Sequence, residues 1–263
     1  MRPFEAIFVP PEAADAVSDR AWLEGMLAAE RALVDAACCL GLVPPEAAAM
    51  VGAACHADLY DERDLAEQGR AAGNPVEPLV RALRGQVGDE YAGYVHRGAT
   101  SQDILDTAAM LVSGRGCDVI DSELGTVADL CAGLAEAHRA TVMAARTLLQ
   151  QAVPTTFGLV AAGWLAGLLY ARDALDALEL PAQLGGAAGT LATADGATGE
   201  LSREGVDVVV AQIDLKMRSA IALRSASGNP IVLVDQLGRM AGLCGDDEIY
   251  RALLQQRRAA GEA

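Results

Sequence analysis

The stretch VHRGATSQDILDTA, residues 95–108, gathers polar groups that could do chemistry directly before an apolar helical pattern. It contains His96, one of three histidines in the chain, followed by Thr100, Ser101 and Gln102. A helix N-terminus offers free backbone N–H groups and the positive end of the helix dipole. Together with an imidazole and two hydroxyls, it can bind a carboxylate. The cluster is therefore a candidate site for an anionic substrate.

The same residues also fit an ordinary helix cap. Gly98 permits a tight turn, and Thr100 or Ser101 can cap a helix that begins just after them. Asp103, three residues after Thr100, approximates a capping box in which aspartate replaces the usual glutamate. Capping explains the hydroxyls but not the histidine, so both interpretations stay open on these residues alone.

A second polar cluster, RTLLQQAVPTT at residues 146–156, separates two apolar helical patterns. Its Thr147, Gln150 and Gln151 are unusual inside a helical bundle, because buried amides and hydroxyls need hydrogen-bond partners. A polar interhelix loop explains the cluster, and so does a second part of a substrate site.

Composition favours a helical protein with a substantial core. The 263 residues are 52% hydrophobic and only 4% aromatic, and alanine and leucine dominate. These two residue types lose little on entering a helix. The net charge of −16 at pH 7 argues against nucleic acid or an anionic membrane surface as the main partner. An anionic substrate would therefore need locally placed donors.

The sequence also predicts a cytoplasmic protein. The N-terminal residues lack the apolar run of a signal peptide, and no apolar stretch is long and charge-free enough to span a membrane. The six cysteines are scattered without C-x-x-C spacing. This favours reduced, mostly buried thiols over disulfides or a metal site.

Apolar periodicity predicts a series of helices. The first can be capped by Ser18 or Asp19, and a later one has an apolar stripe from Ile120 to His138 in alternating steps of four and three residues. That stripe is typical of a helix in a bundle. The helices are expected over 19–40, 45–57, 62–73 and 74–87, from the first polar cluster to about 138, and from about 157 to 180.

The remaining sequence divides the chain further. The glycine-rich stretch 180–199 is not a phosphate-binding loop, because no strand pattern precedes it and no Gly-Lys-Ser/Thr follows. From residue 203 the sequence is less rich in alanine and could contain a strand. We expect an N-terminal helical domain over 1–102, a central long-helix bundle segment over 103–202 and a divergent C-terminal segment over 203–263.

Four blocks occur in an order that resembles the fumarase/aspartase superfamily. They are GNPVEPLV, YVHRGATSQDILDTA, RTLLQQAVPTTFGLVAAGWL and LPAQLGGAAGTLA, and SDRAWLEGML at 18–27 fits the same pattern. The resemblance covers roughly residues 15–195 and is strongest to the bacterial 3-carboxy-cis,cis-muconate cycloisomerase branch.

The resemblance implies a fold and a chemistry. The fold is a mainly α, long-helix bundle, and four copies of the subunit assemble into a homotetramer with active sites at subunit junctions. The chemistry is reversible addition or elimination at a carbon next to a carboxylate of a small polycarboxylate, without a cofactor or metal. In the cycloisomerase branch a substrate carboxylate closes a lactone, a step of aromatic degradation.

The resemblance also assigns roles to residues of both clusters. In the first cluster His96 and Ser101 are expected to be catalytic, and Thr100 and Gln102 to bind substrate. In the second cluster the expected substrate-binding residues are Thr147, Gln150 and Gln151. Arg20 stands where members of the superfamily often hold an arginine that faces the substrate.

Two departures from the family pattern bear on activity. Position 148 is leucine where fumarases place a catalytic histidine, which favours the cycloisomerase branch because leucine cannot transfer a proton. The mobile G-S-S-x-M-P-x-K-x-N-P signature, which supplies a reactive serine, has no match, and only Asn229–Pro230 and nearby serines such as Ser225 and Ser227 are similar. The sequence therefore predicts an altered or shortened C-terminal part.

These observations leave more than one function open. The resemblance favours lactonisation of 3-carboxy-cis,cis-muconate. Elimination from a succinate-like substrate is an alternative within the superfamily. A non-catalytic or repurposed helical oligomer, descended from such an enzyme and only binding a ligand, is an alternative from another functional class, motivated by the missing serine signature.

Overall fold

The computed structural model describes residues 7–39, 41–187 and 225–226, which form two compact units. Unit 1 comprises the described residues up to Gly116 together with those from Glu179 onward, and unit 2 comprises Cys117–Leu178. Helices make up most of both units, which confirms the mainly α fold expected from the sequence. The domain boundaries expected after residues 102 and 202 stay predictions.

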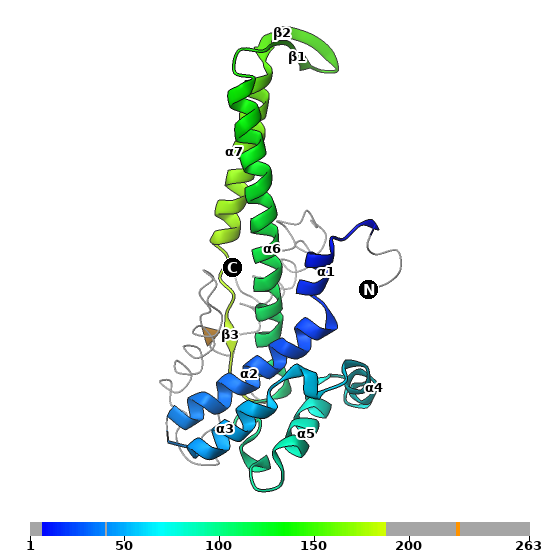
Figure 1. Ribbon diagram of the computed structural model, residues 1–263, viewed down its shortest axis with the longest axis vertical. Coiled ribbons are helices and arrows are strands. Elements are labelled where there is room, and N and C mark those ends of the chain that lie inside the picture. Colours follow the sequence, from blue (N-terminus) through cyan, green and yellow to red (C-terminus); the bar gives the residue numbers. More distant parts are fainter. Residues whose placement is uncertain (1–6, 40, 188–224, 227–263) are drawn as a thin grey trace, which may run out of the picture. The chain divides into compact units, whose positions relative to one another are not determined.

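Unit 1 is a cluster of helices (Figure 1), in which α2 packs on α3 and α5 packs on both α3 and α4. Its helical elements are α1 (Pro11–Ala16), α2 (Asp19–Cys39), α3 (Pro45–Ala54), the 3-10 helix η2 (Ala57–Leu59), α4 (Glu62–Ala72), α5 (Val76–Val87), the 3-10 helix η3 (Ala92–Tyr94) and the first part of α6 (Ser101–Ala137). Ser18 caps α2 as predicted, because its Oγ accepts a hydrogen bond from the Ala21 N–H at 3.2 Å.

The core of unit 1 is made of aliphatic side chains from α2, α3 and α5. A fully buried leucine contributes roughly 1.5–3 kcal/mol relative to an exposed one, so these residues supply most of the local stability. At Gly25 the helices α2 and α6 approach closely, because a Cβ there would lie 3.3 Å from the Ala108 Cβ. The largest fully buried members of this core are Leu23, Leu27, Leu79, Leu83, Val43, Val51, Val76 and Val95.

A second apolar cluster of unit 1 holds the chain that returns beside α6. Leu180 and Leu184 are buried with Met110 of α6 and with residues of α2. Between them, β3 (Ala182–Gln183) pairs in parallel with β4 (Ser225–Ala226). The hydroxyl of Thr107 accepts from the Gln183 N–H at 3.0 Å and donates to its carbonyl at 3.3 Å. The segment before residue 187 is thus fixed along the first turns of α6.

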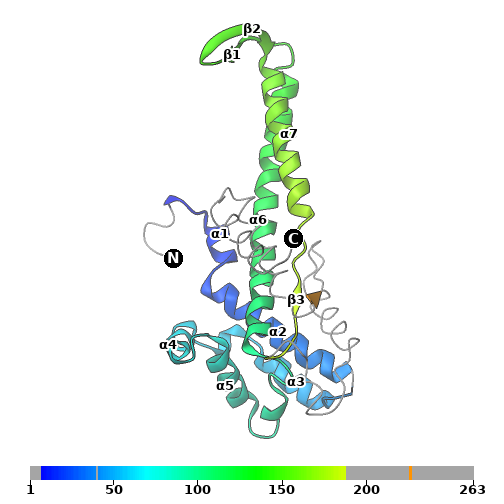
Figure 2. The same ribbon diagram turned by 180° about the vertical axis from the view of Figure 1, so that it is seen from behind.

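Unit 2 is an antiparallel pair of helices joined by a β-hairpin (Figures 1 and 2). The second part of α6 leads into β1 (Val142–Thr147) and β2 (Gln150–Thr156), and α7 (Phe157–Asp176) returns beside α6. Arg172 and Asp121 form a bidentate ion pair, in which Nε donates to Oδ1 at 2.7 Å and Nη2 donates to Oδ2 at 3.0 Å. At Gly158 the helices approach so closely that a Cβ would lie 2.7 Å from the Ala135 carbonyl oxygen.

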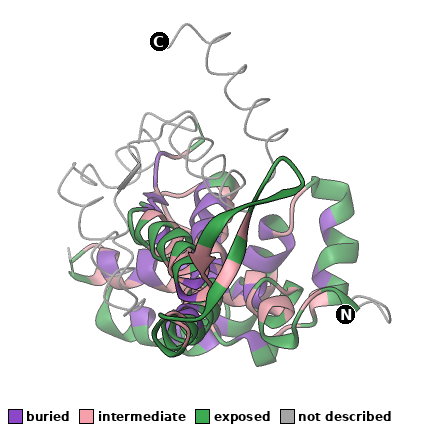
Figure 3. Ribbon diagram, turned by 90° about the horizontal axis from the view of Figure 1, so that it is seen from above, coloured by how far each residue is buried: buried purple, intermediate pink, exposed green. Residues whose placement is uncertain are grey.

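Much apolar surface of unit 2 is exposed in the single chain. Both hairpin strands are exposed along most of their length (Figure 3). The apolar stripe expected on α6 is only partly covered by α7, since Cys131 is buried while Val127 is 42% exposed. The large exposed apolar side chains of the two helices are Ile120, Val127, Leu130, Leu134, Leu159, Trp164, Leu169 and Tyr170.

Several details differ from the sequence-based expectations. Residues 142–156 form a hairpin where a polar interhelix loop was one interpretation. Its strands pair from Val142 with Thr156 to Thr147 with Gln150. Helix α7 ends at Asp176 rather than near 180, since the following residues extend toward β3. The divergent segment 203–263, with Asn229–Pro230 and Ser227, lies outside the described residues except for β4.

The predictions about the cysteines and about membrane-spanning helices can be compared with the described residues. None of the five described cysteines forms a disulfide. Cys117 and Cys131 are buried, but Cys38 and Cys55 are partly exposed and Cys39 is exposed, so the described thiols are less buried than predicted. Cys244 lies outside the described residues. None of the described helices has the length and apolar character needed to cross a bilayer.

Candidate active site

The first polar cluster lies at the N-terminus of α6, and the capping box predicted there is present in part. Helix α6 begins at Ser101, which makes Thr100 the N-cap. The Asp103 carboxylate accepts a hydrogen bond from the Thr100 N–H at 2.9 Å. Gly98 has a φ of 82°, in the left-handed region expected for a tight turn. Helix capping therefore accounts for the local conformation of this cluster.

Asp103 also has a long-range role that capping alone does not require. It is 2% exposed and accepts hydrogen bonds from the Gly185 N–H at 2.9 Å and the Gly186 N–H at 3.0 Å. The glycine-rich stretch thus begins beside the N-terminus of α6, joined to it by one buried carboxylate. Hydrogen bonds to an ionised group are the stronger kind, so this contact fixes the two segments together.

His96 is held by a buried glutamate of α2. Its Nδ1 lies 2.6 Å from Oε1 of Glu30, whose side chain is 1% exposed, while the imidazole is 15% exposed. An ionised carboxylate can only accept, so with Glu30 ionised the donor in this hydrogen bond is Nδ1–H. The backbone of His96 has a φ of 61°, which is uncommon outside glycine. The imidazole is therefore fixed from both the backbone and the ring.

His96 and Ser101 line one pocket of about 290 Å³. Two arginines of α5, Arg81 and Arg84, line the same pocket together with Glu77 and Val80. The Arg84 guanidinium donates one hydrogen bond to the Val95 carbonyl at 3.3 Å, and Arg81 forms an ion pair with Glu77. A guanidinium has five N–H donors, so Arg84 has further donors for an anion. The pocket can bind a carboxylate despite the net negative charge of the chain.

Gln102 faces a different partner from His96. Its side-chain amide donates to the Asp106 carboxylate at 2.5 Å, one turn along α6. Burial raises the pKa of Asp106 above its usual range, partly offset by the hydrogen bonds from Gln102 and Gln183. Gln102 itself is exposed, so a ligand can reach it.

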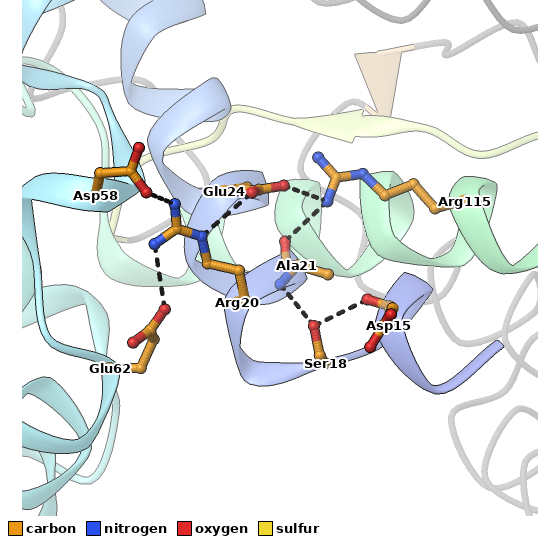
Figure 4. A network of polar contacts seen from close by, with 8 residues as sticks. All are labelled: Asp15, Ser18, Arg20, Ala21, Glu24, Asp58, Glu62 and Arg115. Atoms are coloured by element: carbon orange, nitrogen blue, oxygen red, sulfur yellow. Dashed lines mark hydrogen bonds and ion pairs between the residues drawn. The ribbon is translucent and has the colours of Figure 1, made fainter. Parts of the chain in front are cut away.

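Arg20 lies in an ionic network away from that pocket (Figure 4). Its guanidinium bonds Glu24 at 3.3 Å and Glu62 at 3.4 Å and forms an ion pair with Asp58. The hydrogen bond with Asp58 is the main cause that raises the pKa of Arg20 above its usual value. Arg115 of α6 also binds Glu24, at 2.9 Å.

This network decides what Arg20 can do within one chain. Arg20 lines a separate pocket of about 490 Å³ together with Glu24, Asp58 and His56. The structure therefore does not bring Arg20 and His96 into one pocket, and Arg20 would have to exchange a carboxylate partner to bind substrate. Its role as a substrate-binding residue stays a prediction.

The second polar cluster belongs to the hairpin of unit 2. Thr147 ends β1, Gln150 and Gln151 begin β2, and all three are exposed. The two residues of the turn between the strands, Leu148 and Leu149, have φ values of 47° and 64° and are fully exposed or nearly so. The two clusters thus belong to different units of the chain, and the roles expected for the hairpin residues stay predictions.

The described residues also form a larger pocket, which differs in chemistry from the one beside His96. A larger pocket of about 550 Å³ lies between α2 and α4, lined by Trp22, Leu23, Met26 and Leu65 among others, and holds none of the predicted site residues. The smaller pocket of about 290 Å³ differs from it in combining an imidazole, a hydroxyl and two guanidinium groups. No group of three or more metal-ligating side chains occurs among the described residues.

Sequence reasoning missed Glu30, Arg81 and Arg84. Glu30 gave one signal, since it is a carboxylate inside the apolar pattern of a helix whose neighbours Ala29 and Leu33 are buried. The arginines gave no signal of their own, because exposed arginines on an amphipathic helix are ordinary.

The sequence is similar to that of known lyases and cycloisomerases. A family model described as lyase matches residues 10–226. The chain is 52% identical over 188 residues to nitrosuccinate lyase of Streptomyces davaonensis, covering 70% of this chain and 39% of that protein. It is 44% identical over 195 residues to 3-carboxy-cis,cis-muconate cycloisomerase of Pseudomonas aeruginosa, covering 72% of this chain and 42% of that protein.

A solved structure has the same fold. The 3-carboxy-cis,cis-muconate lactonizing enzyme from Pseudomonas putida matches with a TM-score of 0.76 and 35% sequence identity, over 93% of this chain and 56% of that one. The chain therefore spans 39% and 42% of the length of the two curated relatives named above. The sequence resemblance to the fumarase/aspartase superfamily is confirmed by these matches.

Proposed function

Because the chain belongs to the lyase family of the fumarase/aspartase superfamily, we propose that it binds a small polycarboxylate and takes part in elimination next to a carboxylate. The pocket at the N-terminus of α6 carries this proposal. It places His96 and Ser101 beside Arg81 and Arg84, a combination that can hold a carboxylate and a reacting group at once.

The substrate that we propose first is a succinate carrying a good leaving group, with nitrosuccinate as the example. The similarity to nitrosuccinate lyase, at 52% identity, exceeds that to the Pseudomonas aeruginosa cycloisomerase, at 44%. In such a reaction one C–H bond and the C–N bond break, a carbon–carbon double bond forms, and nitrite leaves with the bonding electrons. The chemistry needs donors for carboxylates and a group that accepts a proton, but no cofactor.

Each residue of the pocket has a proposed role. Arg84 and the free N–H groups at the start of α6 bind a substrate carboxylate, with Thr100 and Gln102 as further donors. His96 and Ser101 lie closest to the reacting carbons and handle the proton. Thr147, Gln150 and Gln151 of the hairpin, and Arg20, would complete the site from other copies of the chain.

Lactonisation of 3-carboxy-cis,cis-muconate is the second candidate. It is supported by the match to cycloisomerases. Leu148 agrees with it, because the sequence resemblance places a catalytic histidine at that position in fumarases but not in the cycloisomerase branch. The two reactions share the same requirement for bound carboxylates, and they differ in the group that adds or leaves.

We further propose that the active form is a homo-oligomer, with a tetramer as the expected state, and that it works in the cytoplasm. Support comes from the apolar side chains that unit 2 exposes, such as Leu130 at 64% and Tyr170 at 77%. Single copies rarely leave such large apolar patches in water, whereas association buries them.

A double variant, Thr100→Ala with Ser101→Ala, tests the proposed site. Nitrosuccinate is offered to the purified chain, nitrite release is followed, and binding is measured separately by calorimetry. We expect kcat/KM to fall by about 100-fold or more, because the variant loses two hydroxyl groups at the site. The matched control is Ser122→Ala, an exposed serine of the same helix, which should leave both measurements unchanged.

The outcomes separate the candidate functions. Loss of the diene absorbance of 3-carboxy-cis,cis-muconate, without nitrite release, favours lactonisation. Binding that depends on Thr100 and Ser101 without turnover of either compound favours a ligand-binding module. Wild-type binding and kinetics in the double variant, with circular dichroism showing an intact fold, would contradict the site.

A further inference from the structure

Helix α2 carries a buried carboxylate, Glu30, of which only one oxygen has a hydrogen-bond partner among the described residues. Glu30 is 1% exposed, and its Oε2 has no hydrogen-bond partner among the described residues. A buried charged oxygen without a partner is costly, because it has given up its hydration and gained no hydrogen bond in return. A structural role alone therefore does not explain why α2 carries glutamate among alanines and leucines at this position.

His96, the hydrogen-bond partner of Glu30, has an unfavourable backbone conformation. His96 has a φ of 61°, in the left-handed region that histidine occupies only occasionally. The two unfavourable features meet in one hydrogen bond of 2.6 Å, between residues 66 positions apart in the sequence. Strained or unsatisfied groups that persist together are typical of functional sites, where the surrounding structure holds them in place.

We propose that Glu30 is a positioning residue that fixes which nitrogen of His96 exchanges protons with the pocket. Its carboxylate holds a proton on Nδ1, because an ionised carboxylate can only accept this hydrogen bond. Nε2 is then the nitrogen at which the ring gains or loses a proton. This inference rests on the proposed function, which assigns proton transfer to His96, and it adds which ring nitrogen does so.

The surroundings of the imidazole support this division between its two nitrogens. One side of the ring contacts the buried carboxylate from α2, and His96 lines the pocket that also contains Arg81, Arg84 and Glu77 of α5. A histidine whose tautomer is fixed by a carboxylate on Nδ1 is oriented for proton transfer at Nε2, and the carboxylate needs no contact with substrate. Glu30 would act in this way, through His96 alone.

Nuclear magnetic resonance of the whole chain, labelled with ¹⁵N-histidine, tests the proposal without any need for turnover. The chain has three histidines, so His96→Gln assigns the His96 signals, and the exposed His56 serves as an internal control. At a pH where the ring is neutral, we expect His96 as the Nδ1–H tautomer and His56 mainly as the Nε2–H tautomer. Glu30→Leu should shift His96 to the Nε2–H form, and Glu30→Gln, whose amide oxygen still accepts, should restore the Nδ1–H form at least in part.

The Glu30 variants also give readouts that a purely structural residue would not produce. In folded Glu30→Leu, kcat should fall about tenfold or more with little change in KM. Glu30→Gln, which keeps an acceptor for the Nδ1 proton, should regain part of the lost kcat. Glu46→Gln, an exposed glutamate of α3, is the matched control and should change neither.

An Nε2–H tautomer of His96 in the wild-type chain would overturn the proposal, and this holds even if the Glu30 variants do not fold. An unchanged tautomer in folded Glu30→Leu would overturn it as well. These results leave the proposed function intact. Conversely, absence of turnover and of polycarboxylate binding would contradict the proposed function without touching the tautomer result.

Discussion

The two units of the chain treat apolar side chains in opposite ways. In unit 1, Leu79 and Leu83 are 0% exposed inside a core shared by three helices. In unit 2, Leu130 is 64% exposed and Trp164 is 51% exposed, although both lie on long helices with a strong apolar pattern. Unit 1 thus completes its core within one chain, whereas the helices of unit 2 have apolar faces left for packing against further helices.

The same contrast holds for the polar residues of the two clusters. In unit 1 two groups of the first cluster have a buried partner from a distant segment: His96 is bonded to Glu30, and Asp103 to Gly185. In unit 2, Gln150 and Gln151 are exposed on a hairpin. A site built from the first cluster can be shaped by one chain, while the second cluster would acquire its surroundings from association.

Truncating one leucine in each unit should show the largest difference. Leu83→Ala removes a fully buried side chain and should lower the free energy of unfolding by about 3 kcal/mol, from lost burial and the cavity left behind. Leu130→Ala, with the same chemical change at an exposed position, should cost less than about 0.5 kcal/mol at low protein concentration. Urea unfolding of both variants measures the two values.

The association state gives this pair of variants a second readout. If unit 2 packs against other copies, Leu130→Ala should shift the chain toward smaller species in analytical ultracentrifugation, and Leu83→Ala should not do so while it stays folded. Equal stability losses at low concentration would contradict the distinction between the two units.

Substitutions in the turn of the hairpin should raise the free energy of unfolding, whereas most substitutions lower it. Leu148 and Leu149 both have positive φ, a conformation that a two-residue hairpin turn usually assigns to asparagine and glycine. Leu148→Asn with Leu149→Gly should therefore stabilise the isolated chain by roughly 1–2 kcal/mol, since leucine is disfavoured in the left-handed region. Thermal unfolding measures the gain.

A control separates the turn conformation from the loss of exposed apolar surface. Leu148→Ser with Leu149→Ser removes the same leucines without supplying residues that favour positive φ, and it should give a smaller gain. An equal gain in both double variants would show that backbone conformation is not the reason.

The smallest expected effect is a pH dependence within unit 2. The hydrogen bonds from Arg172 hold the pKa of Asp121 below its ordinary value of about 4. The folded-state pKa is thus lower than the unfolded one, so the pair stabilises above that ordinary value and loses this contribution as the pH falls through the folded-state pKa. Asp121→Asn should therefore show a slightly smaller loss of thermal stability on acidification than wild type.

Asp118 provides the matched comparison for this titration. Burial, with the nearby Asp121, raises the pKa of Asp118, so its ionised form opposes folding and acidification relieves that cost. Asp118→Asn should consequently steepen the loss of stability on acidification, the reverse of Asp121→Asn. Identical pH profiles for the two variants would contradict the assigned directions.

Sequence reasoning succeeded where a structure depends on neighbours along the chain. The Ser18 cap, the Thr100–Asp103 capping interaction and the turn at Gly98 all involve residues within a few positions of each other. Helix positions followed from apolar periodicity in the same way, with ends within a few residues of those observed. The hairpin was missed because neither strand has a buried face: no residue of β1 or β2 is buried, so apolar side chains do not mark the strands in the sequence.

The sequence by itself determined the helical fold, the family and the two polar clusters, since capping, periodicity and ordered motifs are local properties of the chain. Only the tertiary structure decided that Glu30 holds His96, that Asp103 ties Gly185 and Gly186 to α6, and that Arg84 shares a pocket with Ser101. These contacts join residues up to 83 positions apart. They depend on how helices cross and on which polar groups are buried together, and no local pattern specifies either.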